Sequence, residues 1–232
     1  MIFIHINEKL SNLIINNMLN NVFPKIHKEG YKFLAISIII TFLFLLVSKF
    51  LGCIMIIITV WVYYFFRDPE RYSIDDDKFL VSPADGLISN ISEISGPIEL
   101  GLENKTFTKV SIFMNVFNCH VNRVPISSTV EEIFYKPGKF LNASLDKASE
   151  ENERNYYKIK TKKGEEIVIV QIAGLIARRI VCEVSKNQDL NQGERIGMIR
   201  FGSRVDVYFN NRKLLAKVGQ NVVAGESLIA TE

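Results

Sequence analysis

The chain has few cysteines and little excess of either charge, and these two features exclude several common classes of protein. It contains three cysteines in 232 residues, Cys53, Cys119 and Cys182, and their odd number and wide spacing exclude a disulfide scaffold and a zinc knuckle. Neither charge sign dominates, because 28 basic and 25 acidic residues leave a net charge of +3, too small to indicate a nucleic-acid-binding protein. The charged fraction of 23% argues against a largely disordered chain, and the length is ample for a buried core.

Charge is almost absent between residues 33 and 66. Two apolar runs, Phe33–Ser48 and Phe50–Phe66, are separated by Lys49, and Gly52 follows shortly after. One straight helix over this block would be about 51 Å long, well beyond the roughly 30 Å of a hydrocarbon core. We therefore expect residues 33–66 to form a membrane anchor, a hairpin or re-entrant segment that turns near Lys49–Gly52. A single tilted helix and a buried pair of core helices are the alternatives.

Basic residues flank the apolar block on both sides: Lys25, Lys28, Lys32, Arg67 and Arg71. A hairpin would place both flanks on one side of the membrane, which the positive-inside rule makes the cytoplasmic side. The sequence thus predicts a protein of the cell (inner) membrane with its following domain in the cytoplasm. Residues 1–32 are expected to lie on the membrane surface as an amphipathic segment. A cleaved signal peptide is not expected, because the apolar block starts late and lacks a small-residue cleavage site.

From Pro69 onward the composition changes to short stretches of β-branched and aromatic residues separated by turn residues. The predicted strands are 79–82, 86–93, 106–113, 129–135, 156–161, 165–173 and 204–209. The last of these alternates polar and apolar residues with period two, which is typical of a half-buried strand. Phe140–Arg154 has helical spacing instead. We predict a mainly β fold, an antiparallel β-sandwich or barrel-like domain over 67–232 with one short helix, preceded by an α-helical N-terminal membrane anchor.

Two residues of this domain are candidates for proton transfer. His120 is the one histidine after the apolar block, and histidine is the side chain best suited to carry protons near neutral pH. A structural histidine is an equally open interpretation. Asp85 lies in the segment Ser-Pro-Ala-Asp-Gly at 82–86, where aspartate and glycine are the residues that a turn needs.

Two further features are open to more than one interpretation. Arg178 and Arg179 interrupt an apolar stretch, which suits an anionic ligand such as phosphate or carboxylate, or a structural ion pair with Glu183 or Asp206. Gly202-Ser203 at the start of a predicted strand would ordinarily be a turn. It is not the nucleophile elbow of an α/β-hydrolase, because no strand–turn–helix surrounds it.

Five segments carry a more specific signal in combination. They are Ser-Pro-Ala-Asp-Gly at 82–86, Cys-His-Val-Asn-Arg-Val-Pro at 119–125, and the stretches 136–154, 171–180 and 193–203. In this order they resemble the phosphatidylserine decarboxylase family, in the short form common in bacteria and archaea. The resemblance covers residue 65 to the C-terminus, and the N-terminal hydrophobic anchor also fits that family.

The resemblance implies a proenzyme that cuts itself between Gly202 and Ser203, giving a β chain of residues 1–202 and an α chain of 203–232. In the family, the serine attacks the preceding carbonyl to form an ester, and β-elimination then leaves a pyruvoyl group at the new N-terminus. This pyruvoyl group from Ser203 would be the cofactor, with no metal. It would form a Schiff base with phosphatidylserine and support decarboxylation to phosphatidylethanolamine and carbon dioxide, a step of phospholipid biosynthesis.

The resemblance also implies roles for other residues. His120 would return a proton to the substrate, and Asp85 with His120 would activate Ser203 in the manner of a serine-protease triad. Arg178 and Arg179 are candidates for binding the substrate carboxylate or phosphate on electrostatic grounds.

The chain departs from the family pattern at two positions. Asn118 stands where the short form usually has an aspartate, and Arg123 stands where the longer bacterial form has a second histidine. The roles split between two histidines in the longer form would then fall to His120 alone, or one would pass to another residue.

The expected partners are phosphatidylserine in the membrane and the two self-derived chains, which would form a heterodimer; no nucleic acid is expected. A membrane-tethered serine hydrolase using Ser203, His120 and Asp85 is one alternative, and it would keep the chain intact. A carrier or binding module is another, because residues 217–228 resemble an edge of biotinyl and lipoyl domains. The chain lacks the Met-Lys pair usual in such carriers. A pyruvoyl decarboxylase of a soluble amino acid is a third, and the anchor argues against it.

Overall fold

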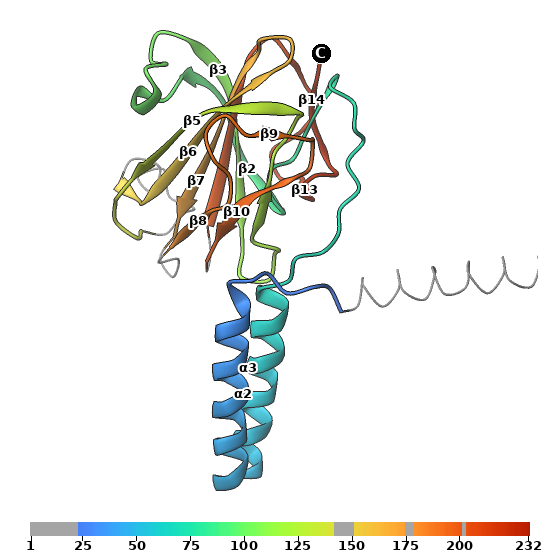
Figure 1. Ribbon diagram of the computed structural model, residues 1–232, viewed down its shortest axis with the longest axis vertical. Helices are drawn as coiled ribbons and strands as arrows, with labels where there is room; N and C mark the ends of the chain where they lie inside the picture. Colours follow the sequence, from blue (N-terminus) through green and yellow to red (C-terminus); the bar gives the residue numbers. More distant parts are fainter. Residues whose placement is uncertain (1–22, 142–150, 175–178, 201–202) are drawn as a thin grey trace, which may run out of the picture. The chain divides into compact units, whose positions relative to one another are not determined.

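The computed structural model describes residues 23–141, 151–174, 179–200 and 203–232. The chain divides into two compact units, Met1–Glu70 and Arg71–Glu232. The described part of the first unit is mainly helical, and that of the second is mainly β (Figure 1). The chain is therefore mainly β, with its long helices near the N-terminus, as predicted.

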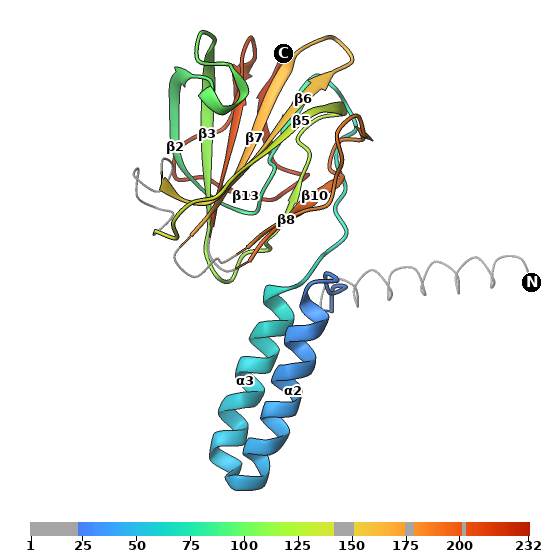
Figure 2. The same cartoon turned by 60° about the vertical axis from the view of Figure 1, so that its left-hand side comes forward.

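Two apolar helices lie side by side in the first unit, α2 (Gly30–Val47) and α3 (Lys49–Phe65) (Figures 1 and 2). Ser48 separates them with an extended backbone (φ −156°, ψ 127°), and the chain reverses direction there. The turn thus lies just before the predicted one, because Lys49 and Gly52 already belong to α3.

The two helices make close polar and steric contacts. The hydroxyl oxygens of Thr41 on α2 and Thr59 on α3 are 2.8 Å apart. Gly52 lies so close to α2 that a Cβ atom there would fall 2.2 Å from Leu45 Cδ2. Small residues and hydroxyl groups of this kind allow helices to pack within a bilayer. By length and composition α2 can cross a membrane, which indicates membrane association; α3 is one residue shorter.

The largest sheet of the second unit has eight antiparallel strands in the order β13-β2-β3-β11-β7-β6-β5-β9. Its strands are β2 (Gly86–Ser95), β3 (Thr106–Met114), β5 (Ser128–Lys136), β6 (Arg154–Thr161), β7 (Glu166–Ala173), β9 (Asp189–Leu190), β11 (Ser203–Phe209) and β13 (Asn221–Val222). Figure 2 shows the long strands of this sheet side by side, with β8 and β10 apart from them. The sheet is curled rather than flat, as the predicted sandwich or barrel-like form requires.

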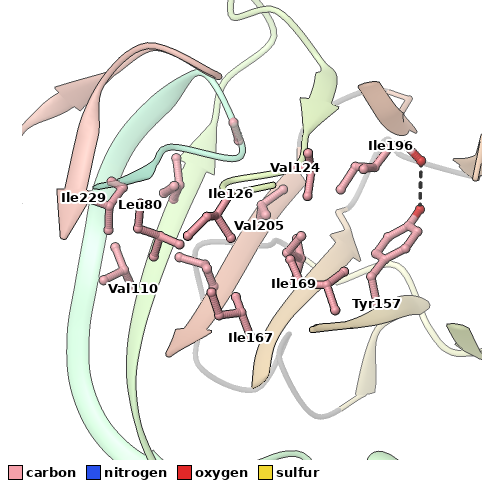
Figure 3. Packing of buried hydrophobic residues seen from close by; sticks show 14 of the residues in the cluster. Leu80, Val110, Val124, Ile126, Tyr157, Ile167, Ile169, Ile196, Val205 and Ile229 are labelled. Atoms are coloured by element: carbon pink, nitrogen blue, oxygen red, sulfur yellow. Dashed lines mark hydrogen bonds between the residues drawn. The ribbon is translucent and has the colours of Figure 1, made fainter. Parts of the chain in front are cut away.

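Two smaller antiparallel sheets accompany it. One has the order β4-β10-β8, with β4 (Val121–Arg123), β10 (Arg195–Ile199) and β8 (Ile180–Cys182); the other has the order β1-β14-β12, with β1 (Phe79–Val81), β14 (Leu228–Thr231) and β12 (Lys213–Leu214). A short 3₁₀ helix, η1 (Ile98–Leu100), lies between β2 and β3. The main core gathers apolar side chains from all three sheets, among them Leu80, Val110, Ile196, Val205 and Ile229 (Figure 3).

Strand β11 is buried on both faces, so the prediction of a half-buried strand was wrong. Val205 and Val207 belong to the main core. On the other face Arg204 and Asp206 are 5% and 1% exposed and form an ion pair, with Arg204 Nε 2.9 Å from Asp206 Oδ1. The polar residues of the alternating pattern are therefore buried as well. Their burial is tolerated because the two opposite charges pair with each other inside the protein.

The seven predicted strands correspond to β1, β2, β3, β5, β6, β7 and β11, with ends that differ by at most two residues. The predicted helix over Phe140–Arg154 falls largely on 142–150, which lie outside the described residues. Among the described residues of this range Glu151 is helical, whereas the prediction was wrong for residues 140–141 and 152–154. Leu141 is not helical and exchanges two hydrogen bonds of 2.8 Å with the Asn152 side chain, and Arg154 begins β6.

Candidate active site

Ser203 is the first residue of β11, and its side chain is fully buried. It lies opposite Met114, the last residue of β3, and opposite Ala173, the last residue of β7. Because side chains alternate along a strand, Ser203 shares the face of Val205, which is the core face. Its Oγ has no hydrogen-bond partner in the described part of the chain. The hydroxyls of Ser92 and Ser111 are also buried without a partner in the described chain, so this feature alone does not distinguish Ser203. Together with its place in the segment 193–203, which carries the family resemblance, it makes Ser203 a candidate nucleophile.

His120 is also fully buried, in the connection between β3 and β4. Its Nδ1 lies 3.0 Å from the carbonyl oxygen of Asn118. A carbonyl only accepts hydrogen bonds, so Nδ1 carries the proton and Nε2 is the basic nitrogen of the neutral ring. The Asn118 side chain in turn accepts a hydrogen bond of 2.9 Å from Asn115 N, which fixes this turn. His120 is thus held in the tautomer that a general base needs.

Asp85 immediately precedes β2 and is 7% exposed. Its Oδ2 lies 2.8 Å from Arg71 Nη2, and its Oδ1 accepts a hydrogen bond of 2.8 Å from Ala224 N. Within the described residues neither oxygen bonds to His120 or Ser203. The predicted contact of a triad is therefore not formed in this structure, where a backbone carbonyl rather than Asp85 orients His120.

The predicted arginine pair is only partly described. Arg178 lies outside the described residues, while Arg179 is exposed and its carbonyl oxygen accepts a hydrogen bond of 3.2 Å from Arg200 N. Asp206, a predicted partner of the pair, binds Arg204 instead. The sequence did not single out Arg200, which directly follows β10 and whose pKa is lowered by burial. The sequence could have drawn attention to Arg200 through its position shortly before Ser203.

Three further polar side chains, Tyr157, Gln171 and Asn122, were not singled out by the sequence either. All three are fully buried. The Tyr157 hydroxyl donates to Gln171 Oε1 at 2.7 Å, and Gln171 Nε2 donates to Asn122 Oδ1 at 2.8 Å. Asn122 and Gln171 lie in two of the segments that carried the family resemblance. Gln171 lies between the apolar residues Val170 and Ile172, which was a signal that could have found it, whereas Asn122 is followed by Arg123 and gave no such signal.

The arrangement is suited to a reaction of the chain with itself. Ser203 is closed to solvent in the uncut chain, so an external substrate has no access to its hydroxyl, whereas the preceding peptide bond is covalently attached to it. Within the described residues, no cluster of three or more His, Cys, Asp or Glu side chains could hold a metal ion.

Comparison with known proteins gives consistent matches. Residues 58–230 match the family model described as phosphatidylserine decarboxylase. A phosphatidylserine decarboxylase proenzyme of Pelagibacter ubique (strain HTCC1062) is 67% identical over 213 residues, which cover 92% of this chain and 99% of the relative. Proenzymes of the same name from Cereibacter sphaeroides (strain ATCC 17025) and Rickettsia prowazekii (strain Madrid E) are each 50% identical, over 92% and 91% of this chain and 93% and 92% of the relatives.

Proposed function

Because this chain belongs to the phosphatidylserine decarboxylase family, we propose that it cuts itself between Gly202 and Ser203 and then decarboxylates phosphatidylserine through a pyruvoyl group made from Ser203. The products would be phosphatidylethanolamine and carbon dioxide, as in a step of phospholipid biosynthesis. Family membership makes the protein a decarboxylase. The single observation that supports self-cleavage is the complete burial of Ser203 with its hydroxyl unpartnered in the described chain.

In the proposed self-cleavage, Ser203 Oγ attacks the carbonyl carbon that is bonded to its own nitrogen, and His120 takes the hydroxyl proton. The carbon–nitrogen bond breaks, the nitrogen gains a proton, and an ester joins the two parts of the chain. Loss of the Ser203 α-proton then breaks the Cβ–Oγ bond and releases the carboxylate of Gly202. The resulting enamine takes up a proton at its β-carbon and becomes an imine. Water then hydrolyses this imine, releasing ammonia and leaving the pyruvoyl group.

The surroundings of Ser203 fit a pyruvoyl group. Its neighbours across the sheet, Met114 and Ala173, are buried and uncharged, so they would hold a small neutral ketone without a charge to solvate. When present, the ketone supplies an acceptor for the electron pair that remains as carbon dioxide leaves. His120 would return a proton to the α-carbon of the substrate. Arg178 and Arg179 would attract the carboxylate or phosphate of the headgroup.

Asp85 enters this proposal as a positioning residue. Its carboxylate joins Arg71 to the backbone of Ala224 and so fixes the turn that begins β2. The first half of β2 pairs with the last residues of β3, where Leu87 lies opposite Phe113, and Ser203 lies opposite the next residue, Met114. A shift of this turn would therefore reach Ser203 through the sheet.

The two chains would stay together after the cut. The α chain of residues 203–232 contains β11, which lies between β3 and β7 in the middle of the eight-stranded sheet. It also contains β12, β13 and β14, which pair within two of the three sheets. The heterodimer would thus keep the strand hydrogen bonds and the core of the uncut chain.

The hairpin supports a location in the cell membrane with the second unit in the cytoplasm. Both ends of the hairpin meet, since His27 N donates a hydrogen bond of 2.8 Å to Phe66 O. Lys25, Lys28 and Arg67 are therefore gathered at the open end of the hairpin. The positive-inside rule assigns such an end to the cytoplasm. An anchor of this kind would keep the enzyme beside a substrate whose acyl chains make extraction into water unfavourable.

The proposed activity is tested with vesicles that contain carboxyl-labelled phosphatidylserine. The wild-type protein should release labelled carbon dioxide and form phosphatidylethanolamine, whereas Ser203→Ala should do neither. Free labelled serine, given in parallel, tests the soluble amino acid as substrate. Release of fatty acids or lysolipid by an uncut chain would contradict the proposal and favour the serine hydrolase.

A further inference from the structure

We propose that the turn of residues 115–118 docks on the lipid bilayer, with the side chain of Phe117 entering the headgroup region of the membrane. The second unit would then contact the membrane at the end of the sheet that holds Ser203 and His120. The inference rests on the proposed function for its partner, since a phospholipid substrate has to reach this end from a bilayer. The rigidity of the turn, its place in the sheet and the charge around it support the inference.

Phe117 is a large apolar side chain that faces solvent. It is 72% exposed and is the most exposed phenylalanine in the described part of the second unit. A single exposed apolar side chain is common on protein surfaces, and Ile98 is 71% exposed as well. Exposure alone therefore does not assign a partner to Phe117, and the argument depends on what surrounds it.

The backbone of the turn is fixed by the asparagine side chains at its two ends. Asn115 Oδ1 accepts a hydrogen bond of 2.8 Å from Phe117 N, and Asn118 Oδ1 accepts one of 2.9 Å from Asn115 N. Asn118 N also donates to Asn115 O at 3.1 Å. Because asparagine side chains that bond to the nearby backbone close a turn in this way, the ring of Phe117 is presented from a rigid support. Burying the ring in a partner therefore costs little backbone entropy.

The same turn is joined to the candidate active site. The carbonyl oxygen of Asn118 lies 3.0 Å from Nδ1 of His120. Met114, which directly precedes the turn, lies opposite Ser203 in the sheet. Contact of Phe117 with a bilayer would thus bring both residues of the site close to the membrane surface.

Ile98 lies at the opposite end of the same sheet. Strand β3 runs from Thr106 to Met114, and β2 pairs with it antiparallel, so that Ser95 lies opposite Thr106. Ile98 follows β2 in the helix η1. Figure 2 shows β2 and β3 side by side. At about 3.4 Å per residue the two ends of β3 are about 27 Å apart, so Ile98 is as exposed as Phe117 but remote from the site.

Two further exposed apolar side chains lie at the end of the sheet that holds the turn. Leu87, in the first part of β2, lies opposite Phe113 of β3. Val218 belongs to a turn whose next residue, Gly219, donates a backbone hydrogen bond of 2.9 Å to Ile88 O. This end therefore offers several apolar side chains to a partner, and the one on the rigid turn is aromatic.

The charge beside the turn suits an anionic lipid surface. Ile199 N donates to His120 O at 3.3 Å, and the next residue, Arg200, donates through its N to Arg179 O at 3.2 Å. These bonds bring the exposed Arg179 to the same end as the turn. Glu153, which accepts a hydrogen bond from the first residue of β8, is buried and does not face a headgroup. Aromatic and cationic side chains together are typical of surfaces that lie at a membrane interface.

The experiment uses Phe117→Trp as a fluorescent probe of the bilayer. The full chain is reconstituted in vesicles of phosphatidylcholine and phosphatidylglycerol whose acyl chains carry bromine near the headgroups. Trp61, the single tryptophan of the chain, is replaced by phenylalanine in every sample. The emission of Phe117→Trp should shift to shorter wavelength and be quenched by the brominated lipid.

Ile98→Trp is the matched control, because Ile98 is equally exposed and is tethered by the same anchor. Its emission should remain that of a tryptophan in water, without quenching. Equal quenching of the two variants, or quenching of neither, would overturn the proposal. A shift of the Phe117→Trp emission without quenching would also overturn it, because a protein surface would then cover the ring.

A second measurement compares two forms of the proposed substrate, long-chain phosphatidylserine in vesicles and a short-chain phosphatidylserine dissolved as monomers. Phe117→Ser should lower the ratio of the first activity to the second by about 10-fold, as expected when an aromatic side chain no longer enters an apolar environment. Ile98→Ser should keep the wild-type ratio. The wild-type ratio in Phe117→Ser would overturn the proposal, because the residue would then not act at the bilayer.

The fluorescence measurement does not require decarboxylase activity, so the failure of this inference differs from the failure of the proposed function. Quenching of Phe117→Trp in a protein that releases no carbon dioxide from phosphatidylserine would overturn the proposed function and leave the membrane contact in place. Decarboxylation by the wild-type protein, together with an unquenched Phe117→Trp, would overturn the membrane contact alone.

Discussion

Gln171 Nε2 donates a hydrogen bond of 2.8 Å to Asn122 Oδ1, and this bond joins two different sheets. Gln171 belongs to β7, which pairs with the strand of Ser203, whereas Asn122 belongs to β4, the strand that directly follows His120. The backbone of Ile199, which donates to His120 O at 3.3 Å, forms a second connection. The proposed nucleophile and the proposed base are thus positioned relative to each other by buried bonds.

Replacing His120 tests its role as general base. His120→Ala should slow self-cleavage by about 10²–10⁴-fold, because no described group then takes the Ser203 proton. Imidazole in the buffer should restore part of the rate by entering the space that the substitution leaves. Cleavage at the wild-type rate would show that another base acts.

Substitutions in the ion pair between Arg71 and Asp85 test whether Asp85 has a positioning role or a catalytic one. Both side chains are largely buried, so Arg71→Met should lower the free energy of unfolding by about 2 kcal/mol. Because Asp85 contacts neither His120 nor Ser203 in the described residues, Asp85→Asn should affect self-cleavage about as much as Arg71→Met. A block of cleavage by Asp85→Asn alone would instead show that the carboxylate acts in the chemistry.

The buried hydroxyl of Tyr157 predicts that the free energy of unfolding falls as the pH becomes alkaline. Burial raises its pKa, so above about pH 10 the unfolded chain loses this proton while the folded chain keeps it. The unfolded state then binds fewer protons, and stability falls by up to about 1.4 kcal/mol per pH unit for this group. Tyr157→Phe should show a shallower fall in denaturant titrations between pH 9 and about pH 11. An identical slope would contradict the prediction.

The contact between α2 and α3 predicts a steric effect at Gly52. A side chain at this position would collide with Leu45, so Gly52→Leu should lower the melting temperature of the helical circular dichroism signal in micelles. Cys53→Leu is the matched control, because the neighbouring Cys53 is exposed. Equal melting temperatures for the two variants would show that the helices do not pack as described.

The long strands were predictable because their β-branched and aromatic residues are set between strong turn signals. The short strands β4, β8, β9, β10, β12, β13 and β14 were not, since two to five residues carry too little pattern and pair only through tertiary contacts. The polar face of β11 was predicted to meet solvent, and it is buried because Arg204 and Asp206 pair with each other. Period two shows which residues share a face, but not what covers that face.

For the candidate site, the sequence identified Ser203 and His120 through motifs. It did not reveal that Asp85 would bind Arg71, because the Asp-Gly turn is compatible with many partners. Asn122 and Gln171 were missed because an amide becomes informative only when its partners are known. Their relation depends on the register of β7 against β11 and on where β4 crosses the core.

The central claim is that Ser203 becomes a pyruvoyl group, and the most direct test is the intact mass of the purified protein with and without Ser203→Ala. The account predicts two chains for the wild type, residues 1–202 and 203–232, the second with the mass of a pyruvoyl group in place of serine at its first position. Ser203→Ala should give one uncut chain. A single chain of 26.5 kDa for the active wild-type protein would contradict the account.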